Sequence, residues 1–248
     1  MIEVKNLYKS FEDKTVLKDI STSFKKGNTN LIIGRSGSGK TVLLKSIVGL
    51  FTPEKGEVLY DKKDFLKMSK DEKKNVREEI GMLFQGSALF DSMTVEENVM
   101  FPLDVFTNKS YEERRERAMF CLDRVNLDGA EKKLPSEISG GMQKRVAIAR
   151  AIALNPKYLF CDEPNSGLDP QTAIVIDELI KELTIEFNMT TIINTHDMSS
   201  VFGIGDNIIF IHDGEKHWEG NKDEIMDSGN EELDNFIFAS EFLKKIKR

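Results

Sequence analysis

Short apolar runs alternate with longer amphipathic stretches over most of the chain. Five runs have the length and the β-branched content of buried strands, at residues 30–33, 80–84, 158–161, 190–194 and 207–211. Helical patterns separate the later runs, and strands that alternate with helices indicate a parallel sheet. The fold class that this pattern predicts is α/β.

Three segments depart from the alternation. Residues 1–30 read as strands and predict a separate N-terminal β subdomain, and residues 54–79 carry dense charge of both signs, which is typical of a solvated surface. Residues 86–135 are helical by pattern. Within them, Thr94–Glu97 and Ser110–Glu113 fit the capping box, in which a hydroxyl and a carboxylate satisfy first-turn amides. We interpret this block as an inserted helical subdomain.

Composition narrows the function classes. The chain has 248 residues with 35 Lys plus Arg and 42 Asp plus Glu, a net charge of −7, which argues against generic nucleic-acid binding. Its two cysteines exclude a disulfide framework. No apolar stretch approaches the roughly 18 residues of a membrane span, and the N-terminal residues lack the apolar region of a signal peptide. We expect a cytoplasmic protein that a partner brings to the membrane.

The clearest chemical motif lies between the first buried run and a predicted helix at residues 41–48. It matches the phosphate-binding pattern GxxxxGK[ST], in the strand–loop–helix context that the pattern requires. Lys40 can reach the β- and γ-phosphates of a nucleotide, and the Thr41 hydroxyl can ligate Mg²⁺. The amides that would surround the phosphates belong to Gly34, Arg35, Ser36, Gly37, Ser38 and Gly39. The motif predicts a P-loop NTPase core that binds ATP with Mg²⁺.

A second motif ends the strand predicted at residues 158–161. Asp162 follows the strand and can hold Mg²⁺ opposite Thr41. Glu163 comes next and can polarise the attacking water. Without the P-loop upstream, a solvated strand end would be the better interpretation. We expect Cys161 to be a core residue, because a buried apolar strand raises the pKa of a thiol.

Ser139, Gly140 and Gly141 precede a long helical run at residues 143–154. A serine N-cap explains them structurally, and a glycine pair at a helix start also offers an anion-binding terminus. Together with the two motifs above, this segment resembles the signature of the ATPase subunits of ABC transporters, and the resemblance covers nearly the whole chain. Met142 departs from the commonest form of the signature, which has glutamine.

The resemblance implies roles for further residues. Gln85 resembles the glutamine that ligates Mg²⁺ and water at the entry to the helical subdomain, and His196 resembles the histidine that touches the γ-phosphate. Phe11 resembles the aromatic that stacks on adenine, with Val16 packed beside the base; a core position for Phe11 is an equal alternative. Asp169 resembles a residue of the D-loop and, before Pro170, also fits a helix N-cap.

The resemblance also implies an architecture and partners. In the family, ATP is held between the P-loop of one subunit and the signature of another, which implies a homodimer. As the ATPase subunit of a transporter, the chain would also have an integral-membrane permease as a partner. The predicted organisation is a single ATPase domain over residues 1–248, with an antiparallel β subdomain at 1–30, a P-loop core at 31–85 and 136–218, a helical subdomain at 86–135 and a C-terminal extension at 219–248.

The stretch from Gly81 to Leu103 is similar to the ATPases of Mce-type (Mla) systems, which move phospholipids across the Gram-negative envelope. It predicts a peripheral protein on the cytoplasmic face of the inner membrane, with a periplasmic lipid-binding subunit and a small accessory regulatory subunit as further candidate partners. We expect Leu89, Phe90 and Met93 to form a groove for a cytoplasmic helix of the permease.

Other functions stay open from the sequence. Amino-acid import, lipoprotein release and cell division use similar ATPases. A DNA-repair or translation ATPase would normally need a long coiled-coil insertion or two nucleotide domains, and 248 residues hold neither. Asn194 to Asp197 has the N-x-x-D spacing of a guanine reader but lacks its lysine.

The C-terminal residues form two apolar stripes on a predicted helix. Leu233, Phe236, Ile237 and Leu243 make one, and Phe238, Phe242 and Ile246 make the other. The helix either folds back on its own domain or crosses to a second subunit; the resemblance to Mce-type ATPases favours the crossing. Ser228 or Asn230 would cap its start.

Overall fold

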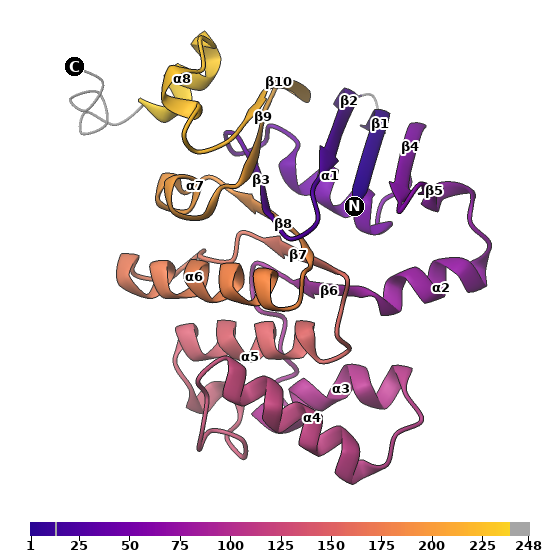
Figure 1. Ribbon diagram of the computed structural model, residues 1–248, viewed down its shortest axis with the longest axis vertical. Coiled ribbons are helices and arrows are strands. Elements are labelled where there is room, and N and C mark those ends of the chain that lie inside the picture. The colour runs from indigo at the N-terminus through magenta and orange to yellow at the C-terminus, as the bar shows by residue number, and fades with distance from the viewer. Residues whose placement is uncertain (13, 239–248) are drawn as a thin grey trace.

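The computed structural model describes residues 1–12 and 14–238. A six-stranded sheet, in the order β10-β9-β3-β8-β7-β6, forms the centre (Figure 1). Its strands are β3 (Thr29–Ile33), β6 (Ile80–Leu83), β7 (Tyr158–Asp162), β8 (Thr190–Thr195), β9 (Asn207–His212) and β10 (Glu215–Gly220). The five predicted strands pair in parallel, and only β10 runs antiparallel, as the second strand of a hairpin with β9.

A second, antiparallel sheet has the order β2-β1-β4-β5. It contains β1 (Ile2–Phe11), β2 (Lys14–Phe24), β4 (Lys55–Tyr60) and β5 (Lys63–Asp64). The limit of this subdomain at residue 30 was therefore wrong, because two of its strands come from the charged stretch at 54–79. Val58, Leu59 and Tyr60 are buried there, whereas helix α2 (Lys70–Glu78) buries no side chain, as expected for a solvated surface.

Neighbouring residues of the central strands face two different cores. Leu31 and Ile33 of β3 belong to the core on the side of helices α3 to α8, whereas Ile32 packs with α1 (Lys40–Val48) and the antiparallel sheet. Both faces of the sheet are covered, which explains why its strands read as continuous apolar runs instead of alternating ones.

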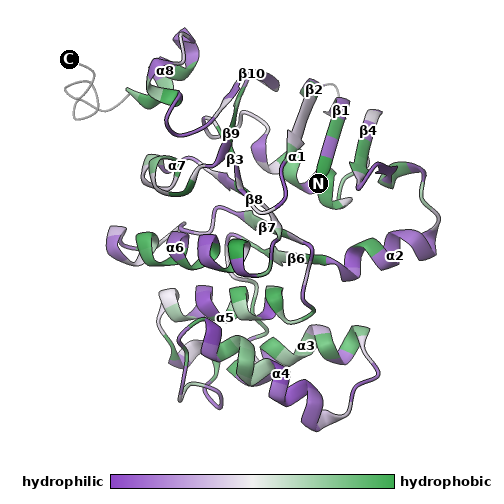
Figure 2. Ribbon diagram, in the orientation of Figure 1, coloured by the Kyte–Doolittle hydropathy of each residue, from purple (hydrophilic) through white to green (hydrophobic). Residues whose placement is uncertain are grey.

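The helical block is present as predicted, and both capping boxes form. Helices α3 (Val95–Phe106) and α4 (Tyr111–Arg124) pack against α5 (Gly140–Ile152), which lies between them and α6 (Pro170–Glu186) (Figure 1). The subdomain thus extends past residue 135, because α5 shares its core. Figure 2 shows the outer turns of α4 as hydrophilic and strand β6 as hydrophobic.

The remaining helices complete the chain. Helix α7 (Met198–Ile204) follows β8, and α8 (Glu231–Ile237) follows β10. Short 3₁₀ turns lie at Phe65–Lys67, Pro135–Glu137 and Ile225–Asp227. Within residues 1–12 and 14–238, none of the helices has the length and apolarity needed to cross a membrane.

Helix α8 packs on its own domain in the part that the structure describes. Asn230 caps it by accepting a hydrogen bond from the amide of Leu233, and Leu233, Ile237 and Phe238 are buried. The Phe236 ring lies 5.5 Å from the ring of Phe210 in β9. Folding back is therefore observed for these residues. Phe242, Leu243 and Ile246, on which the crossing hypothesis also depends, lie outside the described residues.

This packing predicts a stability effect. Leu233→Ala is expected to lower the free energy of unfolding by about 2–5 kcal/mol, because a fully buried leucine leaves a cavity. Urea unfolding of the variant checks this, with Leu50→Ala, at a side chain that is 55% exposed, as the control. A second outcome would instead support a helix that crosses to the other subunit. In it, Leu233→Ala, or a chain truncated after Gly229, would unfold like the wild type but would no longer form a dimer without nucleotide.

Candidate nucleotide site

The P-loop joins β3 to α1 and depends on glycine at two positions. Gly34 has φ 150°, and a Cβ there would lie 2.2 Å from the backbone oxygen of Ile211. Gly39 has φ 108°, and its Cβ would lie 2.9 Å from Leu17 Cδ2. Because glycine has no Cβ, the loop can pass close to β9 and β2 and present its amides at the start of α1. A larger residue at either position would collide with these strands.

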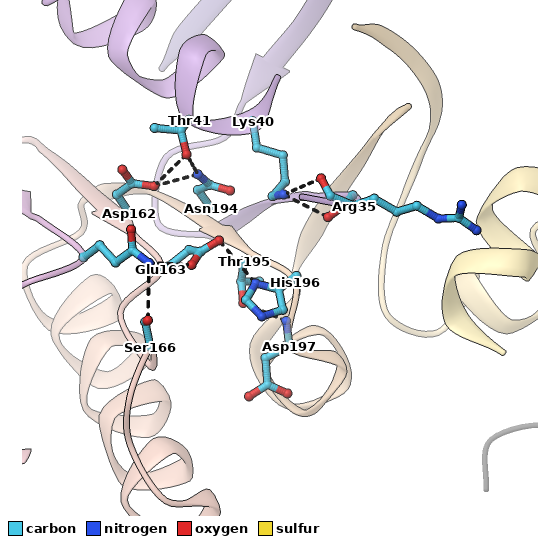
Figure 3. A network of polar contacts seen from close by, with 12 residues as sticks. Arg35, Lys40, Thr41, Asp162, Glu163, Ser166, Asn194, Thr195, His196 and Asp197 are labelled. Carbon is cyan, nitrogen blue, oxygen red and sulfur yellow. Dashed lines mark hydrogen bonds and ion pairs between the residues drawn. The ribbon is translucent and has the colours of Figure 1, made fainter. Parts of the chain in front are cut away.

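Lys40 is buried within its own loop. Its Nζ donates to the carbonyl oxygens of Gly34 at 2.9 Å and Arg35 at 3.0 Å (Figure 3). Desolvation lowers the pKa of Lys40, and the nearby carboxylates of Glu163 and Asp162 act in the opposite direction. The loop thus holds an ammonium group in place, as contact with a phosphate requires.

Thr41, Asp162 and Asn194 form a compact polar cluster (Figure 3). Thr41 Oγ1 donates to Asp162 Oδ1 at 3.2 Å. Asn194 Nδ2 donates to Thr41 Oγ1 at 2.9 Å and to Asp162 Oδ1 at 2.7 Å. The Asn194 side chain is fully buried in this cluster, which does not fit the guanine-contact hypothesis. Asn194 is a site residue that the sequence analysis did not identify.

The donor set of this cluster fits magnesium. A hydroxyl and a carboxylate are oxygen ligands, and Mg²⁺ is usually held by one or two protein groups together with phosphates and water. Gln85 does not join them. Its Nε2 donates to Glu163 Oε2 at 3.1 Å and to Ser166 Oγ at 3.3 Å, and the described residues show no hydrogen bond from it to Thr41 or Asp162. Its predicted role as a metal ligand is therefore not supported by this geometry.

Glu163 lies at the centre of the second polar group. Its backbone is left-handed, with φ 48°, and its amide donates to the carbonyl of Asn194 at 2.9 Å. Its Oε1 lies 3.2 Å from His196 Nδ1 (Figure 3). Both side chains line a cavity of about 440 Å³, together with Asn165, Ser166, Gly167, Thr195, Asp197 and Met198. The predicted catalytic residues Glu163, His196 and Gln85 are thus brought together.

The signature residues lie at the start of α5. Ser139 accepts a hydrogen bond from the amide of Met142 at 3.3 Å, so the N-cap interpretation holds. A Cβ on Gly141 would lie 2.8 Å from Thr172 Cγ2 in α6. Among the described residues, no hydrogen bond joins this motif to the P-loop of the same chain. Contact between Ser139, Gly140 and Gly141 and a nucleotide stays a prediction that requires a second subunit.

The comparison with protein families agrees with these motifs. The family model described as ABC transporter matches residues 17–166. The chain belongs to the ABC transporter family.

Curated relatives within this family transport different substrates. The phospholipid transport ATP-binding protein MlaF of Haemophilus influenzae is 40% identical over 237 residues, which cover 96% of this chain and 90% of MlaF. The methionine import protein MetN of Campylobacter jejuni is 38% identical and covers 98% of this chain and 77% of MetN. The probable ribonucleotide transport protein Mkl of Mycobacterium leprae is 42% identical over 84% of this chain, which spans only 60% of Mkl.

A solved structure shares the fold. The ATP-binding cassette MJ0796 in a dimeric post-hydrolysis state, bound to ADP and Pi, superposes with a TM-score of 0.81 and 36% identity, and the match covers 90% of this chain and 99% of that one. This agreement confirms the predicted α/β P-loop NTPase fold.

Phe11 and Val16, which family resemblance assigns to contact with adenine, differ in exposure. Phe11 is 40% exposed, so it is not a core aromatic. Its ring packs edge-to-face against Phe51 at 5.2 Å, and Lys9 Nζ lies 4.9 Å from its centroid. Val16 is half-buried, and its Cγ1 would lie 3.7 Å from a Cβ on Gly39. Stacking of Phe11 on adenine stays a prediction.

Two of the interpretations drawn from local sequence hold in this ABC domain. Cys161 is fully buried, and desolvation raises its pKa far above that of an ordinary thiol, so it is a core residue. Asp169 caps α6 by accepting hydrogen bonds from the amides of Gln171 and Thr172 at 3.1 and 3.0 Å.

Helix α5 also fixes the loop that carries Gln85. Lys144 Nζ donates to the carbonyl of Gln85, and Arg150 donates to the carbonyls of Ser87 at 2.7 Å and Ala88 at 2.8 Å. Lys144 is buried, and desolvation lowers its pKa and that of Arg150. The sequence analysis missed these roles, because the partner atoms are backbone oxygens about 60 residues away in the chain.

A buried carboxylate behind the cavity predicts a pH effect on stability. Asp177 accepts a hydrogen bond from Asn165 Nδ2 at 2.9 Å, and desolvation raises its pKa from 3.8 to about 6, with Asp197 and Glu178 adding to the rise. Between pH 3.8 and 6 the folded chain keeps a proton that the unfolded chain releases, so stability falls as the pH rises through this window.

Asp177→Asn is expected to remove this loss. Its stability relative to the wild type should grow by roughly 2 kcal/mol between about pH 4 and pH 6 and level off by about pH 7. Urea unfolding over this pH range measures the effect. Glu182→Gln, at an exposed carboxylate further along α6, is the control, and the same pH slope in both variants would contradict the assignment.

Proposed function

We propose that the chain is the ATP-binding and ATP-hydrolysing subunit of an ABC transporter that moves phospholipids across the Gram-negative envelope. The observation that carries the enzymatic part is the meeting of the P-loop, the Thr41–Asp162 pair and the Glu163–His196 pair at the carboxyl ends of parallel strands. The likeness to MlaF over 96% of the chain supports the lipid substrate.

The geometry suggests what each group does. The P-loop amides and Lys40 bind the β- and γ-phosphates, and Thr41 and Asp162 would hold Mg²⁺, which neutralises phosphate charge when bound. Glu163 accepts a proton from the attacking water, and His196 and Gln85 orient it. The signature of a second copy completes the site, since that motif does not reach the P-loop of its own chain. We therefore propose a homodimer.

An apolar groove of about 480 Å³ supports docking to a permease. Phe84, Phe90 and Phe106 line it and are 38%, 39% and 41% exposed. Of the three residues expected there, Phe90 lines the groove, whereas Leu89 packs against the core and Met93 is not among the lining residues. Aromatic side chains at this exposure suit the apolar face of a short helix from a membrane partner. Such docking would place the chain on the cytoplasmic face of the inner membrane.

Methionine import is the second candidate, because MetN covers 98% of the chain at 38% identity. The transporter that co-purifies with a tagged chain from its own membranes separates the two. We expect phospholipid to be retained and ATP hydrolysis to be faster in the permease complex in phospholipid vesicles than in the chain alone. Stimulation by methionine, with no retained phospholipid, would favour import instead.

A further inference from the structure

A buried amide lies between the two candidate magnesium ligands. Asn194 is the fifth residue of β8, and it pairs in the sheet with Asp162 of β7 and Ile32 of β3. Its side chain is fully buried. A buried amide is costly unless it is hydrogen-bonded. Figure 3 shows its nitrogen turned toward both Thr41 and Asp162.

The hydrogen bonds of this amide determine which lone pairs remain free. Thr41 Oγ1 gives its proton to Asp162 Oδ1 and accepts one N–H from Asn194. A hydroxyl oxygen has two lone pairs, so one remains for a cation. Asp162 Oδ1 accepts from both Thr41 and Asn194, and the described residues show no hydrogen bond to Oδ2. The amide thus fixes the rotation of the hydroxyl and the carboxylate together.

We propose that Asn194 is a positioning residue for the magnesium site, which aligns one free lone pair of Thr41 and one free oxygen of Asp162 before the cation binds. This inference rests on the proposed ATPase function. It assigns to Asn194 a task in the metal's outer shell, where partners of ligands typically change metal affinity 10–100-fold. Asn194 Oδ1 is buried and has no hydrogen-bond partner among the described residues.

The test compares nucleotide binding with and without the metal. Binding of AMP-PNP is measured by calorimetry for the full chain in Mg²⁺ and in EDTA, so no turnover is required. The ratio of the two affinities reports the contribution of the metal. We expect Asn194→Leu, which keeps the size of the side chain but has no donor, to reduce this ratio about tenfold and to leave the affinity in EDTA unchanged.

Asn207→Leu is the matched control. Asn207 is also a buried asparagine, in β9 at the opposite end of the same sheet. Both variants are expected to lower the melting temperature, but only Asn194→Leu should change the affinity ratio. A wild-type ratio in a folded Asn194→Leu chain would overturn the inference and leave a structural role only.

A second variant guards against misfolding. Asn194→Thr suits a strand, and its single hydroxyl proton cannot reach both Thr41 and Asp162, so the affinity ratio should fall here too. A wild-type ratio in this variant would overturn the inference as well. Failure of the wild-type chain to bind AMP-PNP would instead overturn the proposed function.

Discussion

Glu163→Gln is expected to bind ATP as the wild type does and to hydrolyse it about 10²–10⁴-fold more slowly, which is the usual contribution of a general base. Glu163 Oε1 lies beside His196, and Oε2 accepts from Gln85, so the amide of glutamine fits the same space but cannot take a proton. Phosphate release under single-turnover conditions measures the loss.

The same variant tests the subunit arrangement. With hydrolysis blocked, the ATP-bound dimer should persist in Mg²⁺ and be visible by sedimentation. Glu178→Gln, which removes a carboxylate from the exposed face of α6, should hydrolyse ATP normally. Near-normal turnover in Glu163→Gln would show that Glu163 is not the general base. Lys40→Ala, in contrast, should weaken ATP binding itself, because it removes a phosphate contact.

Ser139→Arg is expected to reduce hydrolysis by at least about 10²-fold while each chain keeps an intact P-loop. Ser139 is exposed at the start of α5, so an arginine fits the monomer and costs about 1 kcal/mol for the lost N-cap. In a dimer, the longer side chain would enter the space for the partner's phosphate and remove a donor there, and such losses typically cost 10²–10³-fold.

Two controls separate this effect from instability. Ser139→Ala loses the cap without adding bulk, so its stability should match that of Ser139→Arg, with more residual activity. Mixing Ser139→Arg with Lys40→Ala leaves at most one complete site in each heterodimer, so it should restore part of the activity. Activity that stays proportional to protein concentration down to nanomolar dilution would mean that a monomer is catalytic, against the proposal.

The sequence predicted the features that depend on neighbouring residues. The P-loop, the two capping boxes and the N-cap of α6 are set by spacings of a few residues, and the parallel strands by apolar runs. Strands β4 and β5 were missed because charged residues interrupt the run at 55–64, although Val58 and Tyr60 are buried. Their burial depends on pairing with β1, which lies more than 40 residues away.

The candidate site was predictable in its residues but less so in its contacts. The acidic strand end downstream of the P-loop identified Glu163, and family resemblance identified His196 and Gln85. The placement of Gln85 at Glu163 depends on the loop that Lys144 and Arg150 hold. Asn194 was weighed only as a guanine reader. Its actual partners, Thr41 and Asp162, come from helix α1 and strand β7, and no local spacing reveals them.

The two-sided packing of β3 has a consequence for where phosphate can bind. If β3 paired with its neighbours one residue out of register, Ile32 would take the place of Leu31 or Ile33. The side chains that β3 contributes to the two cores would then be exchanged. The change of register would also shift Gly34 by about 3.3 Å along the strand, away from the carbonyl of Ile211 that admits no Cβ. Deleting a single residue from β3 would therefore abolish the candidate nucleotide site and the fold together. The burial of apolar side chains on both faces of β3 thus determines where the P-loop presents its amides to a phosphate.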